Sequence, residues 1–167
     1  MTVVLSPPPY RIYLLRHAKA AAAAGDQRDF DRGLDDVGYA EAESIADQAA
    51  DKGFRPDRVI SSTAVRCHET ADAIRRAHNE TVDFQFVDEL YNGTANTYLE
   101  IIDAQNDSPS VMLVGHNPTM DQVLEALVGH DAAAAAIPQG YPTAGLAVLD
   151  HGGNADAPWT LTAFLKP

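Results

Sequence analysis

Arg16, His17, Arg66 and His116 are the residues whose types and spacing point most directly to chemistry. Arg16, His17 and His116 lie at or just after the end of a strand-like segment, and Arg66 lies on the first turn of the helical segment that follows another. A guanidinium group stays charged at any working pH and matches phosphate oxygens in bidentate fashion, while imidazole acts as a nucleophile or proton carrier near neutrality. Together, the four side chains are suited to holding and transferring a phosphoryl group.

A divalent metal ion is the main chemical alternative, because histidine and carboxylate side chains are common metal ligands. Two arginines at the same place would repel a cation, however. The sequence also contains neither an HExxH motif nor a Cys/His pair of the metal-binding kind. We therefore expect no metal site and no organic cofactor.

The secondary-structure pattern explains how residues so far apart in the sequence could meet. β-branched and aromatic content predicts strands at 10–15, 58–61, 82–87, 110–114, 145–149 and 160–165. Helical spacing and end signals predict helices at 36–52, 63–78, 97–104 and 118–128, with Asn117 as an N-cap before Pro118. The alanine-rich segments 18–26 and 129–144 are interpreted as loops or short helical turns near the mouth of the site.

This alternation predicts an α/β fold, a three-layer α/β/α sandwich whose central sheet is mainly parallel. The last two strands would form a hairpin that adds an antiparallel edge. In such a sheet the carboxyl ends of the parallel strands open onto one edge, where ligands bind. Helix N-termini near Thr63 and Asn117 would point free N–H groups at the same edge, which favours an anion.

Length and composition narrow the class of protein. A chain of 167 residues fits one domain, 1–167, and the formal net charge of −12 opposes binding to nucleic acid or anionic lipid. The chain has no apolar run of membrane-spanning length and no basic leader of the signal-peptide kind, and its lone Cys67 excludes an internal disulfide. We therefore expect a cytoplasmic protein without nucleic-acid or membrane partners; the oligomeric state stays open.

Four motifs in order along the chain resemble the histidine phosphatase, or phosphoglycerate mutase-like, superfamily. They are LLRHAKA at 14–20, SSTAVRCHETA at 61–71, DELYNG at 88–93 and VMLVGHNPTM at 111–120. Arg-His after a strand is weak on its own, but the four together are specific. The resemblance covers nearly the whole chain, including DFDRGLDDVGYAEAE before the first predicted helix, and departs from the family in having Ala18 where Gly is more common.

The resemblance implies that His17 attacks phosphorus and becomes a phosphohistidine that water then hydrolyses. Arg16, Arg66 and His116 would hold the phosphoryl oxygens and stabilise the transition state. Glu89 matches the family's acid position, although Asp88 could take that role. The resemblance also makes Asn117 and Ser62 candidate substrate-binding donors.

Within the superfamily, the short chain resembles SixA-type phosphohistidine phosphatases. Only 26 residues separate Glu89 from His116, which leaves no room for the bulky insertion that covers the site in larger members. An uncovered cleft could admit a phosphohistidine of a histidine phosphotransfer domain in a phosphorelay. The alternatives are a phosphatase of small phosphomonoesters such as sugar phosphates, which would share every catalytic residue, and a non-catalytic phosphate-binding protein.

The remaining histidines and the cysteine have structural interpretations. His78 and His130 are expected near helix C-termini, His151 at the start of a turn, and His68 as a structural residue. Cys67 is interpreted as a small buried residue whose side chain turns away from Arg66.

Overall fold

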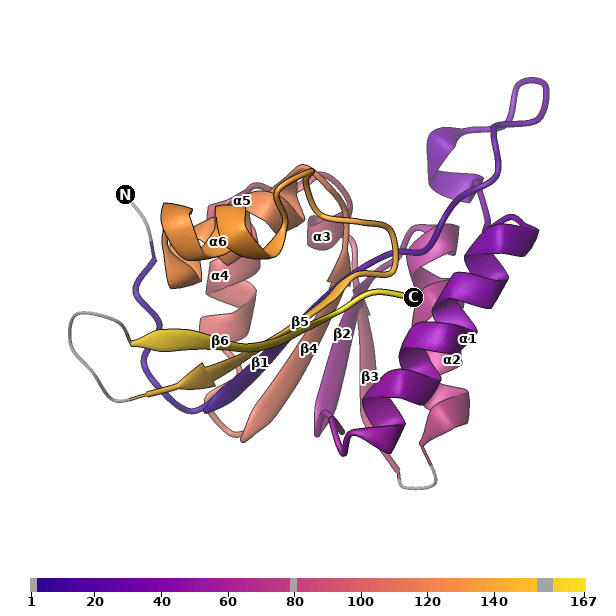
Figure 1. Ribbon diagram of the computed structural model, residues 1–167. Coiled ribbons are helices and arrows are strands. Elements are labelled where there is room, and N and C mark those ends of the chain that lie inside the picture. Colours follow the sequence, from indigo (N-terminus) through magenta and orange to yellow (C-terminus); the bar gives the residue numbers. More distant parts are fainter. Residues whose placement is uncertain (1–2, 79–80, 153–157) are drawn as a thin grey trace.

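A six-stranded mixed sheet lies at the centre of the computed structural model, which describes residues 3–78, 81–152 and 158–167 (Figure 1). Its strands stand in the order β3 (Asp83–Val87), β2 (Arg58–Ser62), β4 (Ser110–Gly115), β1 (Arg11–Arg16), β5 (Leu146–His151) and β6 (Trp159–Leu165). The first four are parallel, and β5 is antiparallel to both β1 and β6. The predicted mainly parallel α/β sheet with an antiparallel pair at one edge is confirmed.

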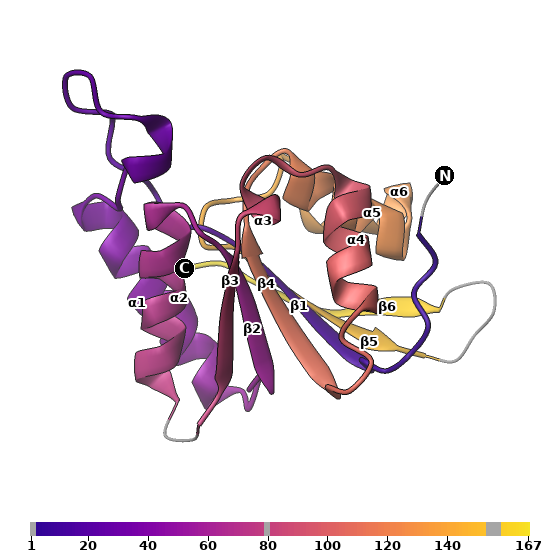
Figure 2. The same ribbon diagram turned by 180° about the vertical axis from the view of Figure 1, so that it is seen from behind.

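Helices cover both faces of this sheet. One face carries α1 (Asp36–Asp51) and α2 (Val65–Ala77), and the other carries α4 (Ala95–Asp103), α5 (Thr119–Val128) and α6 (His130–Ala136), as the two opposite views show (Figures 1 and 2). Two short elements complete the described chain, the 3-10 helix η1 (Asp29–Asp31) and α3 (Glu89–Asn92). The molecule therefore has the three layers expected from the alternating pattern.

The apolar pattern of the strands explains why both faces need a cover. Along β1, Ile12 and Leu14 belong to the core under α4 and α5, while Tyr13 and Leu15 belong to the core under α1 and α2. Successive side chains of a strand point to opposite faces, so a strand that is apolar at every position is stable only between two helical layers. The central strand β4 is buried along its entire length for the same reason.

Two helix starts differ from the expected positions. Helix α2 begins at Val65 rather than Thr63, because the Ser62 hydroxyl accepts a hydrogen bond from the Ala64 N–H (3.2 Å) and keeps the chain in a turn there. Helix α5 begins at Thr119, so its N-cap position falls on Pro118 and not on Asn117. The Asn117 side chain still accepts a hydrogen bond from the Asp121 N–H (3.2 Å), within the first turn.

The predicted helix at 97–104 begins earlier and is preceded by a short helix. Thr94 caps α4 by accepting from the Thr97 N–H, so α4 starts at Ala95. The four-residue α3 is too short to produce a periodic pattern. The alanine-rich segment after Gly129 forms the short helix α6, as one of the two interpretations allowed, and the link between β5 and β6 includes 153–157, which lie outside the described residues.

A loop between β1 and α1 projects from the body of the protein beside the carboxyl ends of the strands (Figure 1). Its neck is closed by an antiparallel bridge between Ala20 and Leu34 and by the hydrogen bond from Ala21 N–H to the Gly33 carbonyl (2.8 Å). Residues 22–29 are exposed, and η1 lies on the side of the loop that faces α2. We call residues 20–34 the η1 loop.

None of the helices in the described ranges combines the length and the apolar character that crossing a membrane requires.

Candidate active site

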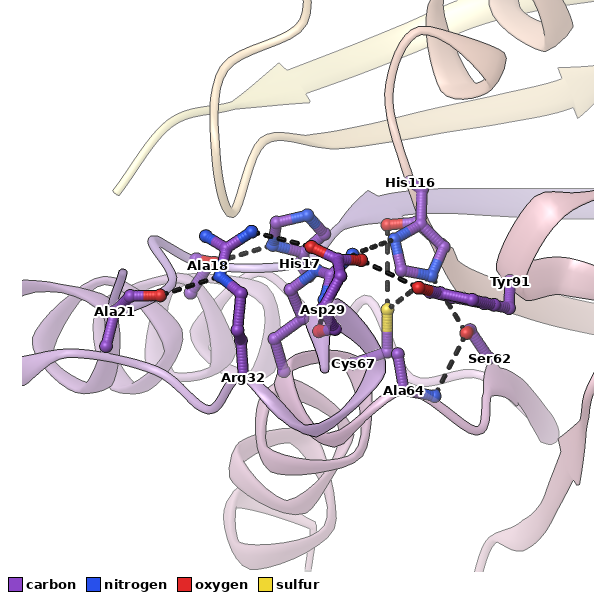
Figure 3. A network of polar contacts seen from close by, with 12 residues as sticks. His17, Ala18, Ala21, Asp29, Arg32, Ser62, Ala64, Cys67, Tyr91 and His116 are labelled. Carbon is purple, nitrogen blue, oxygen red and sulfur yellow. Dashed lines mark hydrogen bonds and ion pairs between the residues drawn. The ribbon is translucent and has the colours of Figure 1, made fainter. Parts of the chain in front are cut away.

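His17 and His116 meet at the point where the chain leaves the sheet in opposite directions. His17 follows β1, which leads to α1 on one face, whereas His116 follows the neighbouring β4, which leads to α5 on the other face. Such a point leaves a crevice beyond the strand ends, where ligands bind in open α/β sheets. The His17 N–H donates to the Gly115 carbonyl (3.1 Å), and the two imidazole centroids are 5.4 Å apart (Figure 3).

The backbone determines which nitrogen of His17 is available. Its Nδ1 lies 2.7 Å from the Ala18 carbonyl oxygen, and a carbonyl oxygen can only accept, so Nδ1 carries the hydrogen. The lone pair is therefore on Nε2. Ala18 is itself held by its N–H donating to Thr70 Oγ1 (3.0 Å), and the Thr70 hydroxyl donates to the Arg66 carbonyl (2.7 Å). These bonds fix the orientation of the ring.

Both imidazoles are neutral at neutral pH. Burial, together with the positive charges of the nearby arginines, lowers the pKa of His17 to about 4, and its residue is only 9% exposed. Burial, His17 and Arg66 lower the pKa of His116 to about 3. Adding a proton to either ring would place a second cation in a poorly solvated space, which is the physical cause of both shifts. A neutral His17 has the nucleophilic lone pair that phosphoryl transfer needs.

The side chains of Ser62 and Cys67 are buried against the imidazole of His116. The Ser62 hydroxyl is 2.8 Å from His116 Nε2, and Cys67 Sγ is 3.5 Å from the same nitrogen. Both residues are fully buried, so the predicted substrate-binding role of Ser62 is not supported by its position. Cys67 is buried as expected, but it contacts the histidine of the site, because the helical step that turns it away from Arg66 turns it towards β4.

Tyr98 holds the backbone of His116. Its buried hydroxyl donates to the Leu90 carbonyl (2.7 Å) and accepts from the His116 N–H (3.1 Å). Gly115 makes this approach possible, because a Cβ at that position would lie 2.6 Å from the Tyr98 hydroxyl oxygen. Tyr98 was not singled out from the sequence, where a tyrosine at helical spacing is indistinguishable from ordinary core.

Arg66 bonds to the η1 loop in the free protein. Its NH1 donates to the Asp29 carbonyl (2.9 Å) and its NH2 donates to Asp29 Oδ2 (3.0 Å). NH2 also lies 3.4 Å from His116 Nδ1, which places the guanidinium between the carboxylate and the imidazole. The Arg66 side chain is 8% exposed, so the η1 loop and not a long insertion covers this part of the site.

Asp29 is the residue of the site that the sequence reasoning missed most clearly. Its Oδ1 accepts from Arg32 NH1 (2.8 Å), and its Oδ2 accepts from the Tyr91 hydroxyl (2.7 Å) as well as from Arg66. Hydrogen bonds from Tyr91 and Arg32 hold the pKa of Asp29 well below its usual value. Figure 3 shows the carboxylate between Arg32 on one side and Tyr91 and His116 on the other. The DFDR sequence was noted as part of the resemblance, but nothing in it indicated these contacts.

Arg16 makes its hydrogen bond outside this network. Its NH1 donates to the Tyr141 carbonyl (2.6 Å), while its Nε is buried and has no hydrogen-bond partner among the described residues. Burial lowers the pKa of Arg16, and its charge contributes to the lowered pKa of His17. Arg16 also lines a pocket of about 440 Å³ formed mainly by residues 137–142 and Lys166.

The two candidate acids have different surroundings. Asp88 accepts a hydrogen bond from the Thr63 hydroxyl (2.6 Å), so its carboxylate is already engaged. Glu89 begins α3 and is exposed, with no side-chain hydrogen bond or ion pair to any described residue. Asn117 is also engaged: its amide bonds to the backbone and the carboxylate of Asp121 and does not point to a phosphoryl site in this state.

The other histidines make contacts outside the site. His68 stacks on Phe86 with ring centroids 4.5 Å apart, and His151 packs against Trp159 at 5.1 Å. His151 ends β5 instead of beginning a turn, and His130 pairs with Glu125 at the junction of α5 and α6. His78 follows the last residue of α2, at the C-terminus where it was expected. No group of three or more His, Cys, Asp or Glu residues suited to a metal ion occurs among the described residues.

Gly115→Ala should move His116. The new Cβ would meet the fully buried Tyr98 hydroxyl, and such overpacking costs about 1–3 kcal/mol of stability. We expect a lower Tm and a displaced amide resonance of His116 in the NMR spectrum. Val111→Ala, a cavity-forming change on the same strand, is the control: it should lower Tm and leave the His116 resonance in place. An unchanged His116 resonance in Gly115→Ala would show that Tyr98 does not hold this backbone.

The imidazole of His17 should titrate at a pH of about 4, as followed by nitrogen chemical shifts with His17→Gln used for assignment. The unfolded chain would take up the proton near pH 6.5 and the native protein only near 4, so stability should fall as pH decreases across that window. A His17 ring that is cationic at pH 6 would contradict the proposed electrostatics.

Comparisons with known proteins agree with this site. Residues 12–92 match the histidine phosphatase superfamily (branch 1). A candidate phosphohistidine phosphatase SixA of Agrobacterium tumefaciens is 56% identical, with 95% of this chain and 99% of that chain covered and a TM-score of 0.89. An uncharacterized Mycobacterium tuberculosis protein is 34% identical over 84% of this chain and 89% of its own length.

The fold is also that of the protein histidine phosphatase SixA solved with tungstate, at 20% identity and a TM-score of 0.76, with 94% and 97% of the two chains covered. The family match, the shared fold and the 56% identity to the Agrobacterium tumefaciens protein over almost the full length agree with the histidines and arginines of the site. This chain belongs to the histidine phosphatase superfamily, is of the SixA type, and is a phosphatase.

Proposed function

We propose that this phosphatase removes the phosphoryl group from a phosphohistidine of another protein, such as a histidine phosphotransfer domain, through a transient phosphohistidine on His17 and without a metal ion. The observation that carries the proposal is the bond from His17 Nδ1 to the Ala18 carbonyl, which leaves Nε2 as an unprotonated nucleophile among Arg16, Arg66 and His116. The depressed pKa of His17 supports the same role.

The reaction has two steps. In the first, His17 Nε2 attacks phosphorus, the P–N bond to the substrate imidazole breaks, and the departing nitrogen takes up a proton. In the second, water attacks the phosphoryl group on His17, which releases orthophosphate and restores the neutral imidazole. Both steps transfer the same charged phosphoryl group, so one set of fixed donors stabilises both transition states.

The oxyanion donors come from three side chains. Arg66 and Arg16 supply guanidinium N–H groups. His116 Nδ1 faces Arg66 as an acceptor in the free protein. A phosphoryl dianion beside it would favour the protonated ring, and Nδ1 would then donate to a phosphoryl oxygen. Fixed positive donors of this kind fulfil the charge-stabilising role that a metal ion has in other phosphatases.

Two features favour phosphohistidine over a phosphate ester. Glu89, the candidate proton donor, is exposed and is not held by any described residue, and a labile P–N bond needs less help from an acid than an alkoxide leaving group does. The interval between Glu89 and His116 is taken up by α3, α4 and β4, without an inserted cap. Small phosphomonoesters remain the second candidate, because they would use the same nucleophile and donors.

A direct test is to mix the protein with a phosphorylated histidine phosphotransfer domain and follow orthophosphate release in the presence of EDTA. We expect turnover, an acid-labile phosphate on the protein in rapid-quench samples, and loss of both in His17→Ala. A panel of sugar phosphates measures kcat/KM for the alternative. Turnover that survives His17→Ala, or that EDTA abolishes in the wild type, would be incompatible with the mechanism.

Glu89→Gln should separate the two substrate classes. General acid catalysis contributes about 10²- to 10⁴-fold, so we expect a loss of that order for ester hydrolysis and a much smaller change for phosphohistidine. Asp88→Asn is the matched control, since its carboxylate is bonded to Thr63, and it should stay near the wild type on both substrates. Equal losses on both substrates in Glu89→Gln would contradict the argument that phosphohistidine is favoured because its leaving group needs less acid catalysis.

A further inference from the structure

The η1 loop brings one carboxylate into the phosphoryl site. Asp29 accepts hydrogen bonds from Arg66, Arg32 and Tyr91, which come from α2, the loop itself and α3. Arg66 also donates to the Asp29 carbonyl, so two N–H groups of its fork are used by a single residue. The motif resemblance predicts that this guanidinium holds a phosphate.

We propose that Asp29 is an internal anion that occupies the oxyanion donors of the resting enzyme, and that an incoming phosphoryl group displaces it together with the η1 loop. This inference rests on the proposed function and concerns how substrate gains access to the same site. It makes Asp29 a determinant of phosphoryl affinity and the η1 loop a gate.

The chemistry of the donors supports the substitution of one anion for another. Two guanidinium groups and a phenol hydroxyl converge on the two oxygens of the carboxylate, which is the donor set that phosphate oxygens also require. Arg66 NH2 contacts both Asp29 and His116, so the carboxylate is one guanidinium group away from the second imidazole.

Asp29 cannot keep these bonds when a phosphoryl group binds. A carboxylate and a phosphoryl dianion on one guanidinium would repel each other at contact distance, and both would compete for the same N–H donors. The bonds to Asp29 also leave the Arg66 side chain only 8% exposed, so the loop must withdraw before another protein's phosphohistidine reaches this donor.

The contacts of the η1 loop allow η1 to open while the neck of the loop stays closed. Its neck is fixed by the Ala20–Leu34 bridge, while its tip at 22–29 is exposed. Besides the polar contacts of Asp29, the edge-to-face packing of Phe30 on Tyr91 (5.1 Å between centroids) holds η1 to the body. If the hydrogen bonds of Asp29 and this ring contact break, the loop can swing away about its closed neck without disturbing the core.

Binding of tungstate or orthophosphate, measured by calorimetry, tests the proposal without any turnover. Asp29→Asn removes the competing charge with almost no change in size, and we expect it to bind either oxyanion about tenfold tighter than the wild type, or more. Asp31→Asn is the matched control on the same helix, because Asp31 pairs only with the exposed Arg28 and should leave the affinity unchanged. Tyr91→Phe keeps the ring on His116 and removes one latch bond, so a smaller gain is expected.

Hydrogen exchange of the wild-type protein provides a second readout that needs no variant. The η1 amides of Asp31 and Arg32, bonded to the carbonyls of residues 28 and 29, should exchange faster when tungstate is bound. Weaker oxyanion binding in Asp29→Asn, or slower exchange of these amides with tungstate, would mean that Asp29 positions Arg66 and would overturn the proposal. If Asp29→Asn binds oxyanions more tightly but the wild-type protein does not hydrolyse phosphohistidine, the proposal for Asp29 stands and the proposed substrate is wrong.

Discussion

The site depends on positive charge that is concentrated where water cannot fully screen it. Arg16 and Arg66 lie at one edge of the sheet beside two buried imidazoles, so each further proton there is unfavourable and both rings stay neutral. Two guanidinium groups so poorly solvated are stable only when anionic or dipolar groups contact them. The free protein meets that need with the Tyr141 carbonyl and the Asp29 carboxylate, and a phosphoryl group meets it during the reaction.

Neutral hydrogen bonds from the core set the directions of the reactive groups. The Ala18 carbonyl selects the tautomer of His17, and Tyr98 holds the backbone of His116. Thr70 links the turn after β1 to the first turns of α2, where Arg66 lies. These residues are buried and rigid, so the imidazoles are oriented before substrate arrives, which is the condition for efficient electrostatic catalysis.

Much of this arrangement is local and therefore predictable. The alternation of strands and helices indicates a mainly parallel sheet. The Arg-His and Gly-His pairs directly after apolar strands indicate that ligands bind at one edge of it. The helix boundaries were less predictable, because the Ser62 hydroxyl delays the start of α2 and Thr94 advances that of α4. Ser62 illustrates the limit: its type suggests a phosphate donor, but its side chain lies beneath His116.

By itself, the sequence determined the fold class and the candidates for the nucleophile and for the phosphate-binding side chains, because each follows from short-range pattern and from the order of the strands. Only the tertiary structure decided what surrounds them. Asp29 and Tyr91 are separated by 62 residues, and Asp29 and Arg66 by 37, yet their side chains share one network. Contacts of this kind depend on how a loop lies against two helices, and no local periodicity or composition encodes that geometry.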